Sequence, residues 1–154
     1  MGKSQGVTLL ELLVTLAVLG IALTIAALNL RPLYDPLSDA VSRTEGYLKQ
    51  VRAKAMATTS AYRVSVNGNR PEAAYAGTCR SPSFTPDPAL QMELPQGVSA
   101  ALTPGGAALC FTSRGLLMLL NGGSYTGEPI LTLRDTPGRS KALKLLLGGG
   151  VVRQ

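Results

Sequence analysis

The side chains that usually perform chemistry are few in this sequence, and their spacing does not suit catalysis. Histidine is absent, which removes the commonest general base and a common metal ligand. A serine or cysteine nucleophile would therefore lack its usual activating base. The nine carboxylates show no spacing typical of a metal site. We therefore expect no catalytic residue, no metal site and no cofactor, and a protein that is not an enzyme.

One carboxylate stands in an unusual place. Glu11 lies near the start of an apolar run, and the 19 residues from Leu12 to Leu30 carry no formal charge. That length is close to the ~20 apolar residues that cross a bilayer as a helix. An ionised glutamate at bilayer depth costs about 2.5–3.5 kcal/mol, and less near the interface. Such a residue usually has a partner; the alternative is a Glu11 side chain that reaches up to the lipid headgroups.

The apolar run follows a short polar segment that carries one positive charge, Lys3. An ordinary secretory signal has a shorter apolar stretch and then a cleavage site of small residues. This run is longer, and its far end shows no such site. Lys3 before the run and Arg31 after it nearly balance, so flanking charge does not orient the segment. Composition alone leaves an uncleaved signal anchor as an open alternative.

Residues 6–14, GVTLLELLV, resemble the type III signal of type IV pilins and pseudopilins. That signal is a glycine, an aromatic or aliphatic residue, and then T-L-[IL]-E-[LV]-[LM]. The resemblance implies that a prepilin peptidase cuts after Gly6 and N-methylates the new terminus at Val7. The family's usual first residue is phenylalanine, so Val7 departs from the pattern.

The same resemblance implies a role for Glu11. In filaments of this family, the glutamate at this position neutralises the N-terminal amine of a neighbouring subunit, here the amine of Val7. Pairing removes the cost of an isolated buried carboxylate. It also sets the axial register, because a misplaced subunit would leave a charge unpaired in an apolar core.

The elements that would position these residues begin with one long helix, expected from about Val7 to about Thr59. Pro32 and Pro36 should kink it or open it locally. An apolar stripe then recurs at spacings of 4 and 3, typical of an amphipathic helix: Leu37, Val41, Thr44, Leu48, Val51 and Ala55. We expect a leader at 1–6, a transmembrane or filament-core helix at 7–30, an amphipathic continuation at 31–60 and a head at 61–154.

From Ala61 onward, short strands separated by Gly and Pro turns are expected. Residues 62–66 alternate and end at the turn dipeptide Asn67-Gly68. A returning strand is expected at 73–76 and a loop at 80–88. Further strands are expected at 90–94, 98–102, 107–112, 116–120, 130–133 and 142–147. A long helix followed by a small antiparallel sheet predicts an α+β domain.

Parts of this region resemble the GspH/FimT branch of the pilin-like proteins. The segments concerned are QVRAKAMA at 50–57 before a strand, LPQGV at 94–98, FTSRG at 111–115 and GGVVR at 149–153. Together with the N-terminal motif, the resemblance covers nearly the whole chain. It implies the pilin fold, in which a long N-terminal helix packs its second half on a small antiparallel β head.

The sequence has two cysteines, Cys79 and Cys110. A disulfide between them would contribute about 3–4 kcal/mol in the chain-entropy model. Two buried free thiols are the alternative. A head on the oxidising side of a membrane favours the disulfide.

The formal net charge is +6, and the end of the chain is notably basic. Some FimT-like minor pilins bind DNA through a C-terminal Gly-Arg-x-Arg motif, but residues 150–153 here read GVVR and lack the first arginine. Lys141 and Lys144 also fall on opposite faces of a strand. DNA binding remains an alternative to a solvated surface, and its candidate residues are Arg134, Arg139, Lys141, Lys144 and Arg153.

The resemblance implies a minor pilin of a type IV pilus, a structural subunit built into a filament or priming it. Such a protein spans the inner membrane once, holds its head on the periplasmic side and then passes into a filament or to the cell surface. Its expected partners are the prepilin peptidase, other pilins or pseudopilins and the inner-membrane assembly platform. The alternatives are a GspH-like minor pseudopilin of a type II secretion system, a DNA-binding minor pilin used in transformation, and an unprocessed single-span anchor. The basic end favours the pilus.

Overall fold

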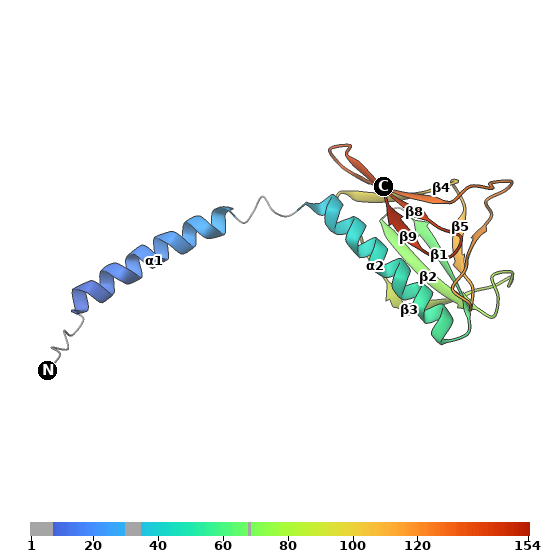
Figure 1. Cartoon of the computed structure of the whole chain (residues 1–154), viewed down its shortest axis with the longest axis horizontal. Helices are drawn as coiled ribbons and strands as arrows, with labels where there is room; N and C mark the ends of the chain where they lie inside the picture. The colour runs from blue at the N-terminus through green and yellow to red at the C-terminus, as the bar shows by residue number, and fades with distance from the viewer. Residues whose placement is uncertain (1–7, 30–34, 68) are drawn as a thin grey trace. The chain divides into compact units, whose positions relative to one another are not determined.

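A computed structural model describes residues 8–29, 35–67 and 69–154 of the 154-residue chain. The chain divides into two compact units, residues 1–35 and residues 36–154, and each is described by itself. The first contains helix α1, and the second contains helix α2 and nine strands (Figure 1).

Helix α1 spans Leu9–Asn29. Its sequence is dominated by Leu and Ala, which are strong helix formers. Thr8 precedes it, and the Thr8 hydroxyl oxygen accepts a hydrogen bond from the Glu11 backbone N–H at 3.3 Å. This contact is typical of a residue that caps a helix N-terminus. The side chains from Leu9 to Ala26 are all exposed within this unit.

Helix α2 spans Pro36–Ala57, and Asp35 just before it is not helical. The expected helix from about Val7 to Thr59 is therefore not continuous at Asp35, beside Pro36, where a kink or a local opening was expected. Proline is well tolerated in a first helical turn, where its missing N–H costs nothing, so Pro36 begins a new helix instead of kinking an old one. The expected opening at Pro32 lies outside the described residues.

The nine strands form two antiparallel sheets. One has five strands in the order β3-β2-β1-β5-β6, and the other has four in the order β4-β7-β8-β9. The strands are β1 Ala61–Asn67, β2 Arg70–Ala76, β3 Thr85–Gln91, β4 Val98–Thr103, β5 Ala108–Phe111, β6 Leu117–Leu120, β7 Ile130–Asp135, β8 Ser140–Leu145 and β9 Val151–Arg153. With α2, they make the predicted α+β class.

The expected loop at 80–88 is wrong in its second half, because β3 begins at Thr85. Pro86 and Pro88 suggested a loop, since proline cannot donate to a strand ladder. However, β3 is the edge strand of its sheet, and an edge tolerates missing donors. Residues 92–94, expected as strand, lie beyond its end.

The main core lies where α2 packs against strands of both sheets. All six positions of the predicted apolar stripe are buried. On the strands, β1 alternates: Tyr62 and Val64 point into this core, while Ala61 and Arg63 face the other side of the sheet. A second, smaller cluster lies on that other side and contains Ala61, Cys79, Cys110, Phe84 and Leu120.

Candidate functional site

The N-terminal motif, residues 6–14, extends into α1. Glu11 lies there and is exposed, three residues after the capping Thr8. A carboxylate in a first turn is favoured by the positive end of the helix dipole. The expected cleavage and methylation residues, Gly6 and Val7, lie outside the described residues.

Within the described ranges, one helix is long and apolar enough to cross a membrane, over residues Leu9–Ala26. Glu11 carries the one formal charge of that segment. Its two threonine hydroxyls donate within the helix, Thr15 to the Leu12 carbonyl at 2.9 Å and Thr24 to the Gly20 carbonyl at 2.8 Å. Apart from Glu11, this segment therefore leaves no side-chain donor to be solvated in an apolar environment.

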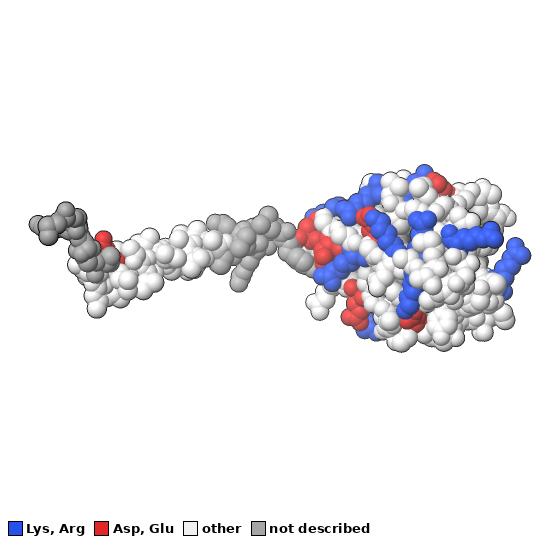
Figure 2. Space-filling view, turned by 60° about the horizontal axis from the view of Figure 1, so that its bottom comes forward, with Lys and Arg blue, Asp and Glu red and all other residues white. Residues whose placement is uncertain are grey.

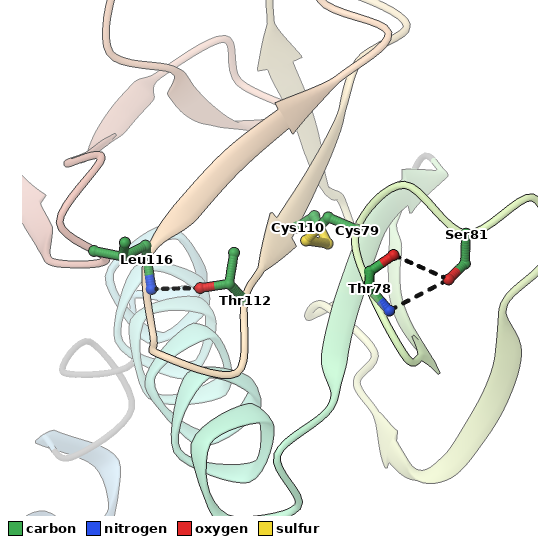
Figure 3. The surroundings of a disulfide bond; sticks show 6 residues. All are labelled: Thr78, Cys79, Ser81, Cys110, Thr112 and Leu116. Atoms are coloured by element: carbon green, nitrogen blue, oxygen red, sulfur yellow. Dashed lines mark hydrogen bonds between the residues drawn. A yellow bond between two sulfur atoms is a disulfide. The ribbon is translucent and has the colours of Figure 1, made fainter.

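In the head, a disulfide joins Cys79 and Cys110 (Figure 3). It attaches the segment after β2 to β5, on the face of the five-stranded sheet that carries the smaller apolar cluster. Beside the bond, the Thr78 backbone N–H donates to the Ser81 hydroxyl at 3.3 Å. The alternative of two free thiols does not hold in this structure.

A buried ionic contact joins α2 to β3. Lys54 Nζ lies 2.6 Å from Asp87 Oδ2, and Asp87 is buried. The Tyr62 hydroxyl and the Ala89 backbone N–H also donate to this carboxylate, at 3.2 and 3.0 Å. The hydrogen bond from Lys54 holds the pKa of Asp87 below its usual value, although burial opposes the shift. No sequence pattern indicated this contact, because Asp87 lay in the expected loop.

The C-terminal cations do not converge on one site. Lys144 pairs with Glu128 at 2.6 Å, and Arg139 pairs with Asp135 at 2.7 Å. On one face of the head, Figure 2 shows the basic side chains as a whole in several separate groups, many beside acidic ones.

Two other members of the set contact α2. Arg153 Nε lies 2.6 Å from Glu45 Oε2, and Lys141 Nζ donates to the Ser38 hydroxyl at 2.6 Å. Lys49 and Arg153 together lower the pKa of Glu45. Arg134 is exposed and pairs with no acid among the described residues. Most of the expected DNA-binding cations are therefore held by contacts within the head, and they fall on both faces of the four-stranded sheet.

Among the described residues, no group of three or more His, Cys, Asp or Glu side chains is placed to hold a metal ion. The buried polar side-chain atoms described all have hydrogen-bond partners. The described residues therefore comprise a membrane-length helix and, later in the chain, a head that is cross-linked by a disulfide and by ion pairs.

Comparison with known families and structures bears on both units. Residues 1–27 match the prokaryotic N-terminal methylation motif. No curated protein matches the sequence.

The structure is similar to the type IV minor pilin FimU of Pseudomonas aeruginosa, with a TM-score of 0.58 and 16% identity over 77% of this chain and 87% of that one. It is also similar to the minor pseudopilin EpsH of the Vibrio cholerae type 2 secretion system, with a TM-score of 0.54 and 12% identity over 78% of this chain and 97% of that one. The chain therefore carries the N-terminal methylation motif, and its α+β fold is similar to the folds of a minor pilin and a minor pseudopilin.

Proposed function

We propose that this protein is a minor pilin, a structural subunit that is built into a type IV pilus or primes its assembly. The observation that carries the proposal is the continuity of the N-terminal methylation motif with a membrane-length helix, in a chain whose head has the pilin fold. Neither the apolar helix nor the head alone would carry the proposal. An ordinary signal anchor has an apolar helix without the methylation motif, and a small α+β head can occur without an apolar helix.

The motif supplies the assembly chemistry. Cleavage after Gly6 creates an ammonium group at Val7, four residues before Glu11 in the sequence. In a filament, Glu11 of one subunit pairs with Val7 of a neighbour, which offsets the cost of placing the carboxylate among apolar helices. Only one axial offset brings the two charges together, so the pair also selects the register.

The same proposal gives the partners and the location. A prepilin peptidase processes the chain, other pilins surround α1 in the filament, and an inner-membrane platform inserts the subunit. The head lies on the periplasmic side before assembly. The Cys79–Cys110 disulfide supports this orientation, because such bonds persist in oxidising compartments.

A second candidate is a minor pseudopilin of a type II secretion system, which the likeness to EpsH favours. The two functions share the processing and assembly steps. Deleting the gene from its native host separates them: loss of surface filaments supports the pilus, and intracellular retention of normally secreted proteins supports the pseudopilus.

The test of the shared step is mass spectrometry of the N-terminal peptide of protein recovered from native membranes. We expect the wild-type peptide to begin at methylated Val7. The control is a Gly6→Leu variant, which should retain the leader. Recovery of wild-type protein that still begins at Met1-Gly2-Lys3 would exclude both candidates and leave an unprocessed anchor.

A further inference from the structure

The five-stranded sheet has a second face, turned away from the main core, and this face is only partly covered. Ala61 and Arg63 of β1 lie on it, as do Cys110 of β5 and Met118 of β6. Register places Arg63 opposite Cys110, and Cys110 opposite Met118, in one row across three strands. We call it the disulfide face.

The segment between β2 and β3 is fastened over part of this face. The Cys79–Cys110 bond holds one end of the segment, and the Arg63 guanidinium lies 4.5 Å from the centre of the Phe84 ring at the other. A cation at this distance over an aromatic ring is attracted to it. The covering is therefore tied at two points.

Next to the disulfide, the face remains hollow. A cavity of about 290 Å³ opens between the Thr78–Ser81 segment and the turn after β5, which Figure 3 shows on either side of the disulfide. Ala61, Cys79 and Met118 give it apolar walls, and Thr78, Arg80 and Ser113 add polar groups. We call it the disulfide hollow. Its volume is close to the ~300 Å³ lower bound of pockets that enclose small ligands, so it suits one or two side chains.

Two arginines beside the hollow have no acidic partner among the described residues, whereas most basic side chains of the head do. Seven basic side chains of the head pair with acids: Arg43, Lys49, Lys54, Arg70, Arg139, Lys144 and Arg153. Arg63, Arg80 and Arg114 form no ion pair with any described residue. Arg80 lines the hollow, and Arg114 follows Ser113, which also lines it. Arg52, Arg134 and Lys141 also form no ion pair with a described residue, but Arg52 and Lys141 donate to a carbonyl and a hydroxyl oxygen, and Arg134 lies on β7. Arg80 and Arg114 thus place unneutralised positive charge beside the concave surface, and this charge is complementary to an anionic partner.

The apolar walls of the disulfide hollow restrict which kind of anionic partner could bind there. Met118 is 36% exposed, and Leu116, just before β6, is 49% exposed. A nucleic-acid backbone offers phosphates but no aliphatic side chain that would cover these groups. A polypeptide with an apolar side chain between carboxylates satisfies both features, and interfaces of this kind place an apolar anchor inside a charged border.

We propose that the disulfide hollow docks an acidic segment of another protein, with one aliphatic or aromatic side chain in the hollow and carboxylates beside Arg80 and Arg114. This goes beyond a role as a filament subunit, because that role rests on α1. The surface is also distinct from the C-terminal cations that the sequence indicated.

The test uses the full-length protein in detergent micelles and two labelled peptides that differ at one position. The probe is Gly-Glu-Asp-Leu-Glu-Asp-Gly, and its partner has alanine in place of leucine. We expect the leucine peptide to bind at least about threefold more tightly, because a buried leucine adds apolar burial that alanine lacks.

Charge is tested with the double variant Arg80→Glu and Arg114→Glu. We expect affinity for the leucine peptide to fall about tenfold or more, since attraction becomes repulsion. The matched control is Arg134→Glu, which reverses another exposed arginine without an acidic partner, on β7. The control should leave affinity unchanged, and near-ultraviolet circular dichroism should show that each variant is folded. Arg80→Gln gives a milder second variant.

Three results would overturn the proposal. They are no binding of the leucine peptide at ~1 mM, an equal loss in the Arg134→Glu control, and tighter binding of an oligonucleotide of matched charge. The last would assign the face to nucleic acid. Because the assay requires neither processing at Gly6 nor a filament, its failure is distinguishable from failure of the minor pilin function.

Discussion

Lys54 on the last turn of α2 and Asp87 on the edge strand β3 form an ion pair with a 2.6 Å contact. The strand pairs with a single neighbouring strand, β2, because it lies at the end of its sheet. Asp87 also accepts hydrogen bonds from Tyr62 of β1 and from the Ala89 backbone. The Asp87 carboxylate therefore links helix α2, the central strand β1 and the edge strand β3.

The first prediction concerns loss of this carboxylate. Asp87→Ala should lower the free energy of unfolding by about 1–3 kcal/mol, because the Tyr62 hydroxyl and the Ala89 N–H lose their acceptor in a buried place. Urea unfolding followed by circular dichroism measures the change. Glu93→Ala is the matched control, since it breaks the exposed pair with Arg70 and should have little effect. Equal losses in the two variants would contradict the buried-acceptor explanation.

The second prediction is the pH dependence of the same contact. The pKa of Asp87 is lowered in the folded state, mainly by the hydrogen bond from Lys54, while an unfolded Asp titrates near pH ~3.9. The stabilisation is therefore fully present above that pH and is lost as the pH falls through the folded pKa.

Asp87→Asn keeps an acceptor but removes the titration. The difference in unfolding free energy between wild type and this variant should be largest near neutral pH and should shrink below about pH 4. Other acids, such as Glu45, are present in both proteins and cancel in the comparison. A difference that stays constant from neutral pH down to pH ~3 would show that Asp87 is not stabilised as a carboxylate.

The third prediction concerns the disulfide. The cysteines are 31 residues apart, so the double variant Cys79→Ala and Cys110→Ala should lose about 3–4 kcal/mol in the chain-entropy model. Chemical denaturation under non-reducing conditions gives the value. As a control, wild-type protein in excess reductant should unfold at nearly the same denaturant concentration as the double variant. Wild type that is unaffected by reductant would argue against the bond.

The fourth prediction concerns Gly149, in the turn between β8 and β9. Its φ is +83°, and a Cβ there would overlap the Gly115 carbonyl oxygen and the Arg52 guanidinium. Arg52 donates from α2 to the carbonyls of Gly115 and Gly148, both at 3.0 Å, so the site joins three distant segments. Gly149→Ala should therefore cost about 2–4 kcal/mol, from backbone strain and overpacking together.

The adjacent residue provides the control for this substitution. Gly148 has no atom within 4 Å of its would-be Cβ and no positive φ, so Gly148→Ala should be close to neutral. Thermal unfolding of the two variants side by side measures the contrast. Equal melting temperatures would mean that the turn relaxes without cost.

The fifth prediction concerns Glu11. Glu11→Gln should leave membrane insertion and cleavage after Gly6 intact, because the apolar segment is unchanged, but should deplete the protein from sheared filaments. The amide cannot neutralise the Val7 ammonium of a neighbouring subunit. Immunoblots of membrane and filament fractions measure the ratio. A normal filament share for this variant would remove the proposed pairing.

Sequence periodicity predicted α2 well because a helix next to a core repeats its buried positions within a few residues. The stripe from Leu37 to Ala55 is confirmed. Tyr47 is also buried and was not predicted, because its polar end is satisfied by the Leu90 carbonyl, 43 residues along the chain. Burial raises the pKa of this tyrosine. Helical periodicity does not reveal a hydrogen bond to a residue this distant in the sequence.

The candidate site was predicted less completely than the fold. The basic C-terminal set looked continuous along the sequence, but adjacent strand residues face opposite ways. The structure also supplies carboxylates from remote segments, Glu45 on α2 and Glu128 before β7. The disulfide hollow was missed because its walls come from β1, β6 and the segments after β2 and β5, which only the sheet register brings together.

Pro86 and Pro88 limit how neighbouring molecules can associate with the head. Both lie on β3, at the outer end of the five-stranded sheet, and each withholds a backbone hydrogen-bond donor. A strand from another molecule cannot form a continuous ladder along that border. Heads that crowd together there are restricted to side-chain contacts, which separate readily, so this border does not seed fibrous aggregates.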